Sequence, residues 1–436
     1  MKRTSWILCK SIAFSFSTKM SLLYSLFVSL TLIILRLASP FSTKIRKWLE
    51  GRKNWRAKLK ASNIANQKHI VWFHCASLGE FEQAKPVMMA VRKEMPEYAI
   101  LLTFFSPSGY EARKNTEWAD FVTYLPADTR KNARDFVKIA NPTLAIFVKS
   151  EIWPHYMTAL AQAKTVSILF SARFYEGQPV FKINFFKKSL KKFSRIFVQD
   201  KASQNLLQRH NIENLIAGDT RFDQVLQLKS SYKNYPKVEE FVSNTPTLVV
   251  GSCWPQDIEV LKKFVNDQNS RVKIILAPHD ISDKMIKSIV DDLSVSYIKY
   301  SKINSDPHFA RKKVLIIDNI GMLAHIYQYA QVAYVGGAFK QGLHNILEPA
   351  VYGIPIIFGP NTKGFPEALE ILIEGCAFSV KNETELNHLL SDLFDEKKKN
   401  TTLGKKNLHY VESKAGATEK IMQYILKIEA ENFKNT

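Results

Sequence analysis

The sequence is poor in cysteine and glycine, with four cysteines and 16 glycines in 436 residues. No cysteine forms a CxxC pair, which disfavours a disulfide framework or a zinc module. The expected state is therefore separate, buried or half-buried thiols at Cys9, Cys75, Cys253 and Cys376. No stretch matches the dinucleotide GxGxxG or the Walker GxxxxGK[ST] fingerprint. We also find no metal-ligand cluster, no internal repeat and no low-complexity tract, so we expect no cofactor and no metal.

Acidic residues are outnumbered by basic ones, 40 against 61, which gives a formal net charge of +21. Such an excess attracts phosphates, whether of nucleic acid, acidic lipid or an anionic metabolite. A membrane-tethered nucleic-acid-binding protein is one alternative. It is disfavoured because no RRM, KH or helix-turn-helix signature is present. The length suits two domains plus an appendage, and an apolar content of 46% provides material for their cores.

The N-terminal region carries one long apolar run, "MSLLYSLFVSLTLIILRLASPF", from Met20 to Phe41, in which Arg36 is the single charge. Its length is close to that of a membrane-spanning helix. Basic residues flank it and no small-x-small cleavage site follows, so we predict an uncleaved anchor over residues 1–43 that spans or dips into the bilayer. The denser positive charge after the run favours a cytoplasmic location for the body of the protein. Whether translation starts at Met1 or Met20 is left open.

Beyond the anchor, short apolar runs alternate with helical stretches, which indicates parallel strands covered on both faces. We predict an α/β protein with two doubly wound, Rossmann-like domains at 44–228 and 245–436, facing each other across a cleft. The intervening stretch 226–246 is predicted to be a linker. The predicted strands lie within 69–76, 99–106, 121–126, 143–150, 165–172, 195–199, 247–252, 272–278, 295–300, 314–318, 332–337, 355–360 and 376–380.

A lone acid follows the first predicted strand in "WFHCASLGEFEQ" (72–83). The strand breaks at Ser77-Leu78-Gly79, and Glu80 stands at the mouth of the next helix. One interpretation is a first-turn glutamate that complements the helix macrodipole. The other is a general base, because ligands of open α/β sheets bind outside the carboxyl ends of the strands.

The most informative stretch of the second domain is "VAYVGGAFKQGLHNILEPAVYG" (332–353). Glycines allow a backbone to approach a phosphate, and a helix predicted to start near His344-Asn345 would offer free N–H groups. Glu348, one turn in, is suited to hold a ribose diol. The stretches "GSCWPQD" (251–257) and "DNIGML" (318–323) repeat the strand-to-loop pattern, and the three loops together indicate a nucleotide site.

Five motifs carry a resemblance to a known family: "SLGE" (77–80), "FFSPSG" (104–109), "EIWP" (151–154), "GGAFKQGLHNILEPA" (336–350) and "FGP" (358–360). In this order and spacing the chain resembles the 3-deoxy-D-manno-octulosonic acid (Kdo) transferases of lipopolysaccharide synthesis. The resemblance covers nearly the whole chain, including the anchor. It implies an inverting glycosyltransferase of the GT-B fold at the cytoplasmic face of the inner membrane.

The resemblance also implies the partners and the site. The donor would be CMP-Kdo, and the acceptor would be the tetra-acylated lipid A precursor (lipid IVA). The enzyme would bind an anionic membrane surface, and no nucleic-acid partner is expected. Glu80 would be the catalytic base and Glu151 would stabilise the transition state. Arg221 of "GDTRFD" stands where the family has a lysine and is therefore a third predicted catalytic residue. The residues implied in donor binding are Pro278, His279, Ile320, Gly321, Met322, Gly337, Asn345, Ile346, Leu347 and Glu348.

The sequence departs from the family pattern in its donor motifs. "APHD" stands where the family has P-R-H, so one phosphate-binding arginine is missing. Candidates to replace it are Lys149, Arg173 and Lys363. Other departures are Leu343, Met322 and Gly364, where the family has a glycine, an acid and an asparagine. A GT-B enzyme that uses a UDP-sugar therefore remains an alternative.

Overall fold

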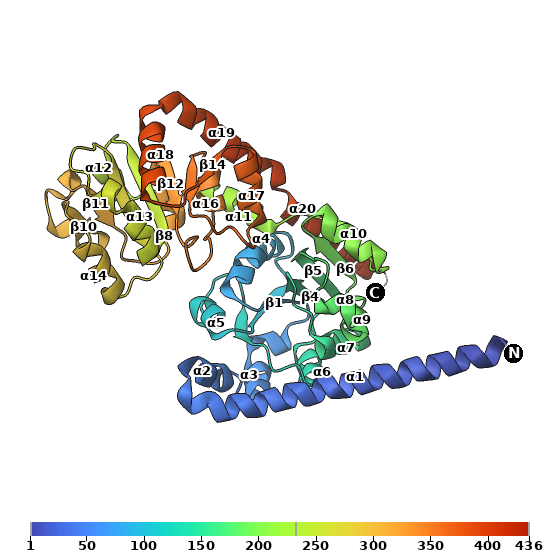
Figure 1. Ribbon diagram of the computed structural model, residues 1–436. Helices are drawn as coiled ribbons and strands as arrows, with labels where there is room; N and C mark the ends of the chain where they lie inside the picture. The colour runs from blue at the N-terminus through green and yellow to red at the C-terminus, as the bar shows by residue number, and fades with distance from the viewer. Residues whose placement is uncertain (1, 232, 435–436) are drawn as a thin grey trace. The chain divides into compact units, whose positions relative to one another are not determined.

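The computed structural model describes residues 2–231 and 233–434, with side chains for 20–231, 233–396 and 400–431. The chain forms two compact units (Figure 1). The first comprises the chain through Gln224 together with the C-terminal segment from Ala415, and the second comprises Val225–Lys414. The last helix, α20 (Ala417–Lys434), thus belongs to the first unit, whereas the sequence analysis placed it in the second domain.

The first unit is built on a seven-stranded, entirely parallel sheet in the order β3-β2-β1-β4-β5-β6-β7. The strands are β1 (Ile70–Cys75), β2 (Ala99–Phe104), β3 (Phe121–Tyr124), β4 (Leu144–Val148), β5 (Val166–Ala172), β6 (Arg195–Val198) and β7 (Leu215–Ile216). The helices are α1 (Lys2–Ala38), α2 (Thr43–Gly51), α3 (Trp55–Ala61), α4 (Leu78–Glu94), α5 (Pro107–Arg113), α6 (Arg130–Ala140), α7 (Pro154–Gln162), α8 (Pro179–Lys182), α9 (Asn184–Leu190), α10 (Lys201–Arg209) and α20. Helix α11 (Thr220–Ser230) begins in the first unit and continues into the second.

The strands of this sheet are apolar on both faces because helices cover both faces. On one face Trp72 packs in a cluster with Phe136 and Tyr156. On the other face Phe73 lies in a cluster with Phe81 of α4 and Met422 of α20. The terminal helix therefore completes the core of the first unit.

The second unit repeats the architecture, with a parallel sheet in the order β10-β11-β9-β8-β12-β13-β14. Its strands are β8 (Thr247–Cys253), β9 (Lys273–Pro278), β10 (Tyr297–Lys299), β11 (Val314–Ile316), β12 (Val332–Val335), β13 (Ile356–Phe358) and β14 (Ala377–Ser379). Its helices are α12 (Pro236–Val242), α13 (Pro255–Val265), α14 (Asp283–Asp291), α15 (Leu323–Ile326), α16 (Leu347–Val351), α17 (Pro366–Ile373), α18 (Glu383–Asp395) and α19 (Lys397–Lys414).

Every strand predicted from the sequence is present, and the prediction of two doubly wound α/β units is confirmed. The short edge strand β7 was missed because it consists of two exposed residues. The predicted linker 226–246 was wrong in part, since it contains the end of α11 and all of α12, whose Val238 and Phe241 are buried in the core of the second unit. Cys75, Cys253 and Cys376 are free and buried as expected, and Cys9 lies outside the residues with described side chains.

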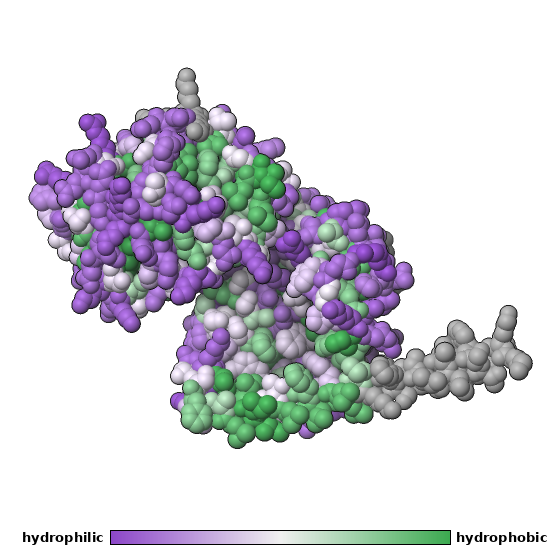
Figure 2. All heavy atoms as spheres, in the orientation of Figure 1, coloured by the Kyte–Doolittle hydropathy of each residue, from purple (hydrophilic) through white to green (hydrophobic). Residues whose placement is uncertain are grey.

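The long N-terminal helix α1 packs along the first unit through a polar face. The Tyr24 hydroxyl donates a 2.8 Å hydrogen bond to the carboxylate of Asp128, and Ser25 Oγ lies 3.0 Å from His155 Nε2. The guanidinium of Arg130 donates a 2.8 Å hydrogen bond to the hydroxyl of Ser21. Its opposite face exposes apolar side chains, which gather along this edge of the unit in Figure 2. Over residues 20–41 the helix is long and apolar enough to cross a membrane.

Candidate active site

Glu80 lies just beyond the carboxyl end of β1, as the third residue of α4. Its Oε2 accepts a 3.0 Å hydrogen bond from the backbone N–H of Ser77, which completes a capping box at the start of the helix. The side chain is buried, at 8% exposure. Burial, and then the charge of Glu151, raise the pKa of Glu80 to about 7 against the opposing effects of backbone N–H groups and Lys149. Both interpretations of Glu80 are therefore compatible, because one carboxylate can cap the helix and also be poised to exchange a proton near neutral pH.

Glu151 stands on the loop that follows β4, the strand that pairs with β1. Its Oε2 accepts a 2.9 Å hydrogen bond from the indole N–H of Trp153, and His74 Nε2 lies 3.4 Å from the same oxygen. Lys149, two residues earlier, adopts an uncommon left-handed backbone with φ of 67°. Neighbouring parallel strands thus bring the two predicted catalytic acids into mutual electrostatic influence.

A buried hydrogen-bonded chain supports Glu151 from beneath. The indole N–H of Trp72 donates 2.8 Å to the hydroxyl of Thr103, and that hydroxyl lies 2.9 Å from His74 Nδ1. The Thr103 hydroxyl also donates 3.3 Å to the carbonyl oxygen of Phe73, so it can accept from both Trp72 and His74 Nδ1. The chain holds the imidazole in place with Nε2 on the side of Glu151. Sequence analysis missed His74 because it lies within an apolar strand and reads as a core residue.

Arg221 is held at the N-terminal end of α11 by Asp219. Its Nε and Nη2 lie 2.9 Å and 2.8 Å from Asp219 Oδ2, and Gln83 of α4 donates 3.1 Å to the other carboxylate oxygen. Although burial alone would raise it, the pKa of Asp219 is held below its ordinary value by Arg221. Asp219 therefore remains ionised and links Arg221 to the helix that carries Glu80.

In the second unit, Asp257 joins the loops that follow β8 and β12. Its carboxylate accepts hydrogen bonds from the backbone N–H of Trp254 at 2.8 Å and of Gly337 at 2.9 Å, and from the Tyr334 hydroxyl at 2.9 Å. Gly337 has φ of 94°, and a Cβ there would lie 2.3 Å from the carbonyl oxygen of Gly342. Only glycine fits this position.

Three rings stack beside these loops. The ring of His279 lies 4.5 Å from that of Trp254 and 4.6 Å from that of His344, centroid to centroid. The Trp254 indole donates a 3.0 Å hydrogen bond to His344 Nε2. Burial, and then the nearby His279, lower the pKa of His344 to about 4. His344 is therefore neutral near pH 7 and accepts from Trp254.

The comparisons with known proteins identify the family. The family model described as "3-Deoxy-D-manno-octulosonic-acid transferase (kdotransferase)" matches residues 53–224. The 3-deoxy-D-manno-octulosonic acid transferase of Aquifex aeolicus is 30% identical over 344 residues, covering 77% of this chain and 89% of the relative. This chain belongs to the 3-deoxy-D-manno-octulosonic acid transferase family. The Rickettsia prowazekii transferase is 28% identical over 369 residues, covering 81% of this chain and 78% of the relative.

Solved structures support the GT-B type of this Kdo transferase family member. A Neisseria meningitidis UDP-GlcNAc 2-epimerase bound to UDP-GlcNAc aligns with a TM-score of 0.60 at 13% identity, covering 82% of this chain and 99% of the epimerase. Acinetobacter baumannii MurG aligns with a TM-score of 0.52 at 11% identity, covering 83% of this chain and 99% of the MurG chain. At these identities the likeness concerns the fold alone.

Some of the transferase's predicted donor-binding residues can contact a ligand through their side chains, and others only through their backbone. Asn345 and Glu348 are fixed together, since Asn345 Nδ2 donates 3.1 Å to Glu348 Oε1 and Asn345 Oδ1 accepts from the Leu347 N–H at 3.1 Å. Ile320 is exposed and precedes Gly321, whose φ is 93°. The side chains of Met322, Ile346 and Leu347 are buried in the core, so only their backbone atoms can face a ligand.

Two details of the predicted donor site differ from expectation. Helix α16 begins at Leu347 rather than near His344-Asn345, and the side chain of Asn345 accepts from the Leu347 N–H in the turn before the helix. Of the three candidate replacements for the missing arginine, Lys149 and Arg173 lie in the first unit, where Arg173 pairs with Asp200 at 3.2 Å. Lys363 alone among the three lies in the second unit.

Trp254 and His344 lie within two of the predicted loop motifs, but neither was predicted as a site residue. The proline directly after Trp254 was the available signal, because it marks a helix start at the strand end. Across the side chains that the structure describes, no group of three or more His, Cys, Asp or Glu residues is placed to hold a metal ion.

Proposed function

We propose that this family member transfers Kdo from CMP-Kdo to the lipid A precursor, the tetra-acylated lipid IVA, with inversion at the anomeric carbon. The observation that carries the proposal is Glu80, a buried carboxyl group beyond a strand end whose pKa of about 7 suits a general base. Membership of the Kdo transferase family supports the sugar that is transferred.

The proposed reaction is a single displacement. Glu80 accepts the proton of an acceptor hydroxyl while that oxygen bonds to the anomeric carbon of Kdo. The bond from that carbon to the phosphate oxygen breaks, and its electron pair leaves with CMP. One displacement from the opposite side inverts the configuration, so the protein needs one base and no covalent intermediate.

Glu151 is proposed to stabilise the positive charge that develops on the sugar ring. Preorganised charge is effective when its orientation is fixed before the reaction. Trp153 and His74 hold Glu151 in this way. Arg221, fixed by Asp219, is proposed to assist catalysis as a cation whose orientation needs no further adjustment.

The second unit is proposed to bind the CMP-Kdo donor. The backbone near Gly337 and Gly321 can approach phosphate closely, and the paired Asn345 and Glu348 can bind the ribose. Pro278 and His279 border the same loops, where the ring stack limits the movement of His279.

The inner membrane, at its cytoplasmic face, is the proposed location, because the acceptor is an acylated glycolipid. The exposed apolar face of α1 is suited to enter the interface, and basic residues near it would be attracted to anionic lipid.

Nucleotide competition tests the donor assignment against the UDP-sugar alternative. CMP should displace a fluorescent CMP analogue from the purified protein, whereas UDP at the same concentration should not. Glu348→Ala should weaken the binding of CMP while thermal stability is kept. Preferential displacement by UDP would contradict the proposal.

A further inference from the structure

A cavity of about 490 Å³ opens on the first unit among α1, α2, α3 and the connection between β3 and α6. Its lining is amphiphilic. Leu32, Trp48 and Trp55 contribute apolar surface. The charged side chains that line it are Arg36, Arg46, Arg52, Lys53 and Glu50, so cations outnumber acids by four to one.

Arg52 is the innermost of these cations. It donates hydrogen bonds to the carbonyl oxygens of Leu125 at 2.7 Å, Trp48 at 2.9 Å and Phe105 at 2.8 Å, and its guanidinium lies 3.7 Å from the centroid of the Trp48 ring. Three of its five N–H donors are thereby used. Burial lowers the pKa of Arg52 to about 9. The site thus holds a desolvated cation that retains donor capacity.

Among the described residues none of the four cations forms an ion pair, and Arg36, Arg46 and Lys53 are exposed. Neither Arg52 nor Arg46 forms an ion pair with a carboxylate, and Arg46 donates instead to the carbonyl of Pro40 at 3.2 Å. Arg56, on the neighbouring helix α3, differs because it pairs with Asp135 at 2.8 Å. Arg52 is the one half-buried cation among the four, and burying an unpaired cation is costly unless an anion compensates for it.

The cavity adjoins the apolar face of α1, and a chain of aromatic contacts connects it to Glu151. Residues of α1 next to Arg36, such as Leu37 at 72% exposure, are open to solvent. Toward the interior, the ring centroid of Trp48 lies 5.6 Å from that of Phe105, which lies 5.1 Å from the ring of Trp153. The indole N–H of Trp153 in turn donates a hydrogen bond to Glu151. An amphiphile held here would reach from a lipid surface toward the reacting groups.

We propose that this cavity binds a phosphate group of the acceptor glycolipid, with Arg46, Arg52 and Lys53 as its ligands. Guanidinium groups bind phosphate through paired, charge-assisted hydrogen bonds, and Arg52 is preorganised to do so. This inference rests on the proposed function and adds to it the site that recognises the acceptor's charge.

The test compares the phosphorylated acceptor with the same glycolipid after removal of its phosphates. Donor-free binding in detergent micelles and Kdo transfer are both measured. Arg46→Gln with Lys53→Gln should weaken binding and raise the KM for the phosphorylated acceptor by at least about tenfold, with little change in kcat. The same double variant should bind the dephosphorylated acceptor as the unmodified protein does.

A matched control removes the same amount of charge outside the cavity. Lys58→Gln with Lys60→Gln changes two exposed lysines of α3 and should leave acceptor binding unchanged. An equal loss in this control would overturn the proposal in favour of general surface charge. Equal binding of the two acceptors by the unmodified protein would overturn it as well.

The source of the phosphate is tested in the same binding assay. Inorganic phosphate at millimolar concentration, or phosphatidylglycerol in the micelles, should compete weakly compared with the phosphorylated acceptor. Full competition by phosphatidylglycerol would show a generic lipid site and overturn the proposal. A failure of the proposed function is distinguishable, because transfer would then be absent with both acceptors whatever the binding measurements show.

Discussion

His74 Nε2 lies 3.4 Å from Oε2 of Glu151. The imidazole is completely buried, and Thr103 fixes its other nitrogen from below. The fixed imidazole packs against the carboxylate, and the indole N–H of Trp153 donates a 2.9 Å hydrogen bond to the same oxygen. Glu151 is therefore preorganised, while Glu80 on the adjacent element has a pKa suited to proton transfer.

Removing the nitrogen atoms of His74 tests whether it positions Glu151. His74→Phe keeps most of the ring volume and leaves Glu151 and Thr103 without this partner. We expect kcat to fall by about tenfold, the KM for CMP-Kdo to stay the same, and unfolding to become easier by about 1–3 kcal/mol. His74→Gln should recover part of kcat. Lost stability with an unchanged kcat would leave His74 a purely structural residue.

Glu80→Gln separates the two roles of this carboxyl group. The amide oxygen can still accept from the Ser77 N–H, so the helix cap should survive while the base is lost. We expect transfer to fall by at least roughly 100-fold with CMP binding unchanged. Glu80→Ala should also lose about 1 kcal/mol of stability because the cap is removed. Near-normal turnover in Glu80→Gln would refute the assignment of the base.

The pH dependence of stability provides an independent measurement on the same group. The folded pKa of Glu80 is about 7, above its ordinary value of 4.5, so the folded protein binds this proton more tightly than the unfolded chain. The stability contributed by Glu80 is therefore complete below the unfolded pKa and is lost as the pH rises through about 7. From about pH 5 to about pH 8, the unmodified protein should lose stability relative to Glu80→Gln. A pH-independent difference in chemical denaturation would contradict the raised pKa.

Gly337→Ala tests the close approach in the loop after β12. A Cβ at this position would lie 2.3 Å from the Gly342 carbonyl oxygen, so the loop must move. We expect weaker binding of CMP and a lower melting temperature. Gly375→Ala is the control, because Gly375 also has a positive φ, 66°, with nothing within 4 Å of the added Cβ, and lies outside the proposed donor loops, so only the cost of backbone strain should appear.

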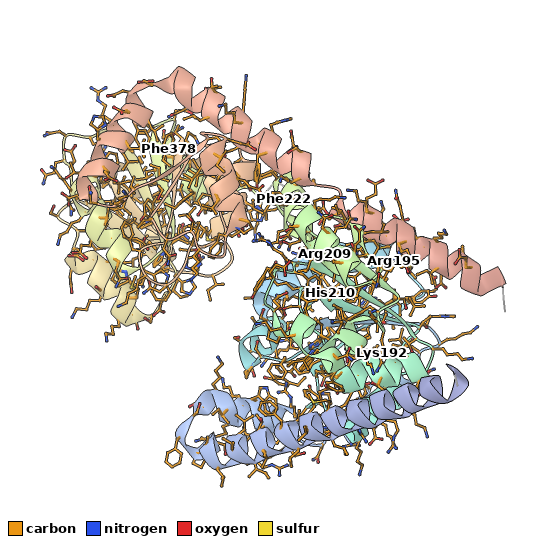
Figure 3. The ribbon with its side chains drawn as sticks, turned by 45° about the vertical axis from the view of Figure 1, so that its right-hand side comes forward. Lys192, Arg195, Arg209, His210, Phe222 and Phe378 are labelled. Atoms are coloured by element: carbon orange, nitrogen blue, oxygen red, sulfur yellow. The ribbon has the colours of Figure 1, made fainter. Side chains whose placement is uncertain are left out.

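The lysine-rich stretch 181–193 is a further candidate for membrane attachment. Lys187, Lys188 and Lys191 form no ion pair among the described residues, whereas Lys192, labelled in Figure 3, donates a 2.6 Å hydrogen bond to the hydroxyl of Thr158. Changing the first three to serine should reduce binding to anionic vesicles at low salt, with each lysine contributing on the order of 1 kcal/mol. Binding that is unchanged in a vesicle sedimentation assay would assign attachment to α1 alone.

Sequence patterns predicted the strands well because each is a short apolar run, and the central strands β1, β2 and β4 are buried along their whole length. They could not assign α20 to its unit, since an amphipathic helix fits either core. The assignment depends on Asp223, which accepts hydrogen bonds from the N–H groups of Gly416 and Thr418, both at 2.6 Å.

The candidate site was predictable only in part, for a similar reason. Glu80 and Glu151 follow strand ends and can be found by position. His74, Arg52 and Trp254 act through neighbours that are distant in sequence, namely Glu151, Phe105 and His344, so their roles depend on tertiary contacts that no local pattern encodes.

The most direct test of the central claim is mass spectrometry of the acceptor after incubation of the purified protein with CMP-Kdo and lipid IVA. We expect a product heavier by one or more Kdo units, formed together with CMP, and no product when UDP-sugars replace CMP-Kdo. An unmodified acceptor with CMP-Kdo, or sugar transfer from a UDP donor instead, would contradict this claim.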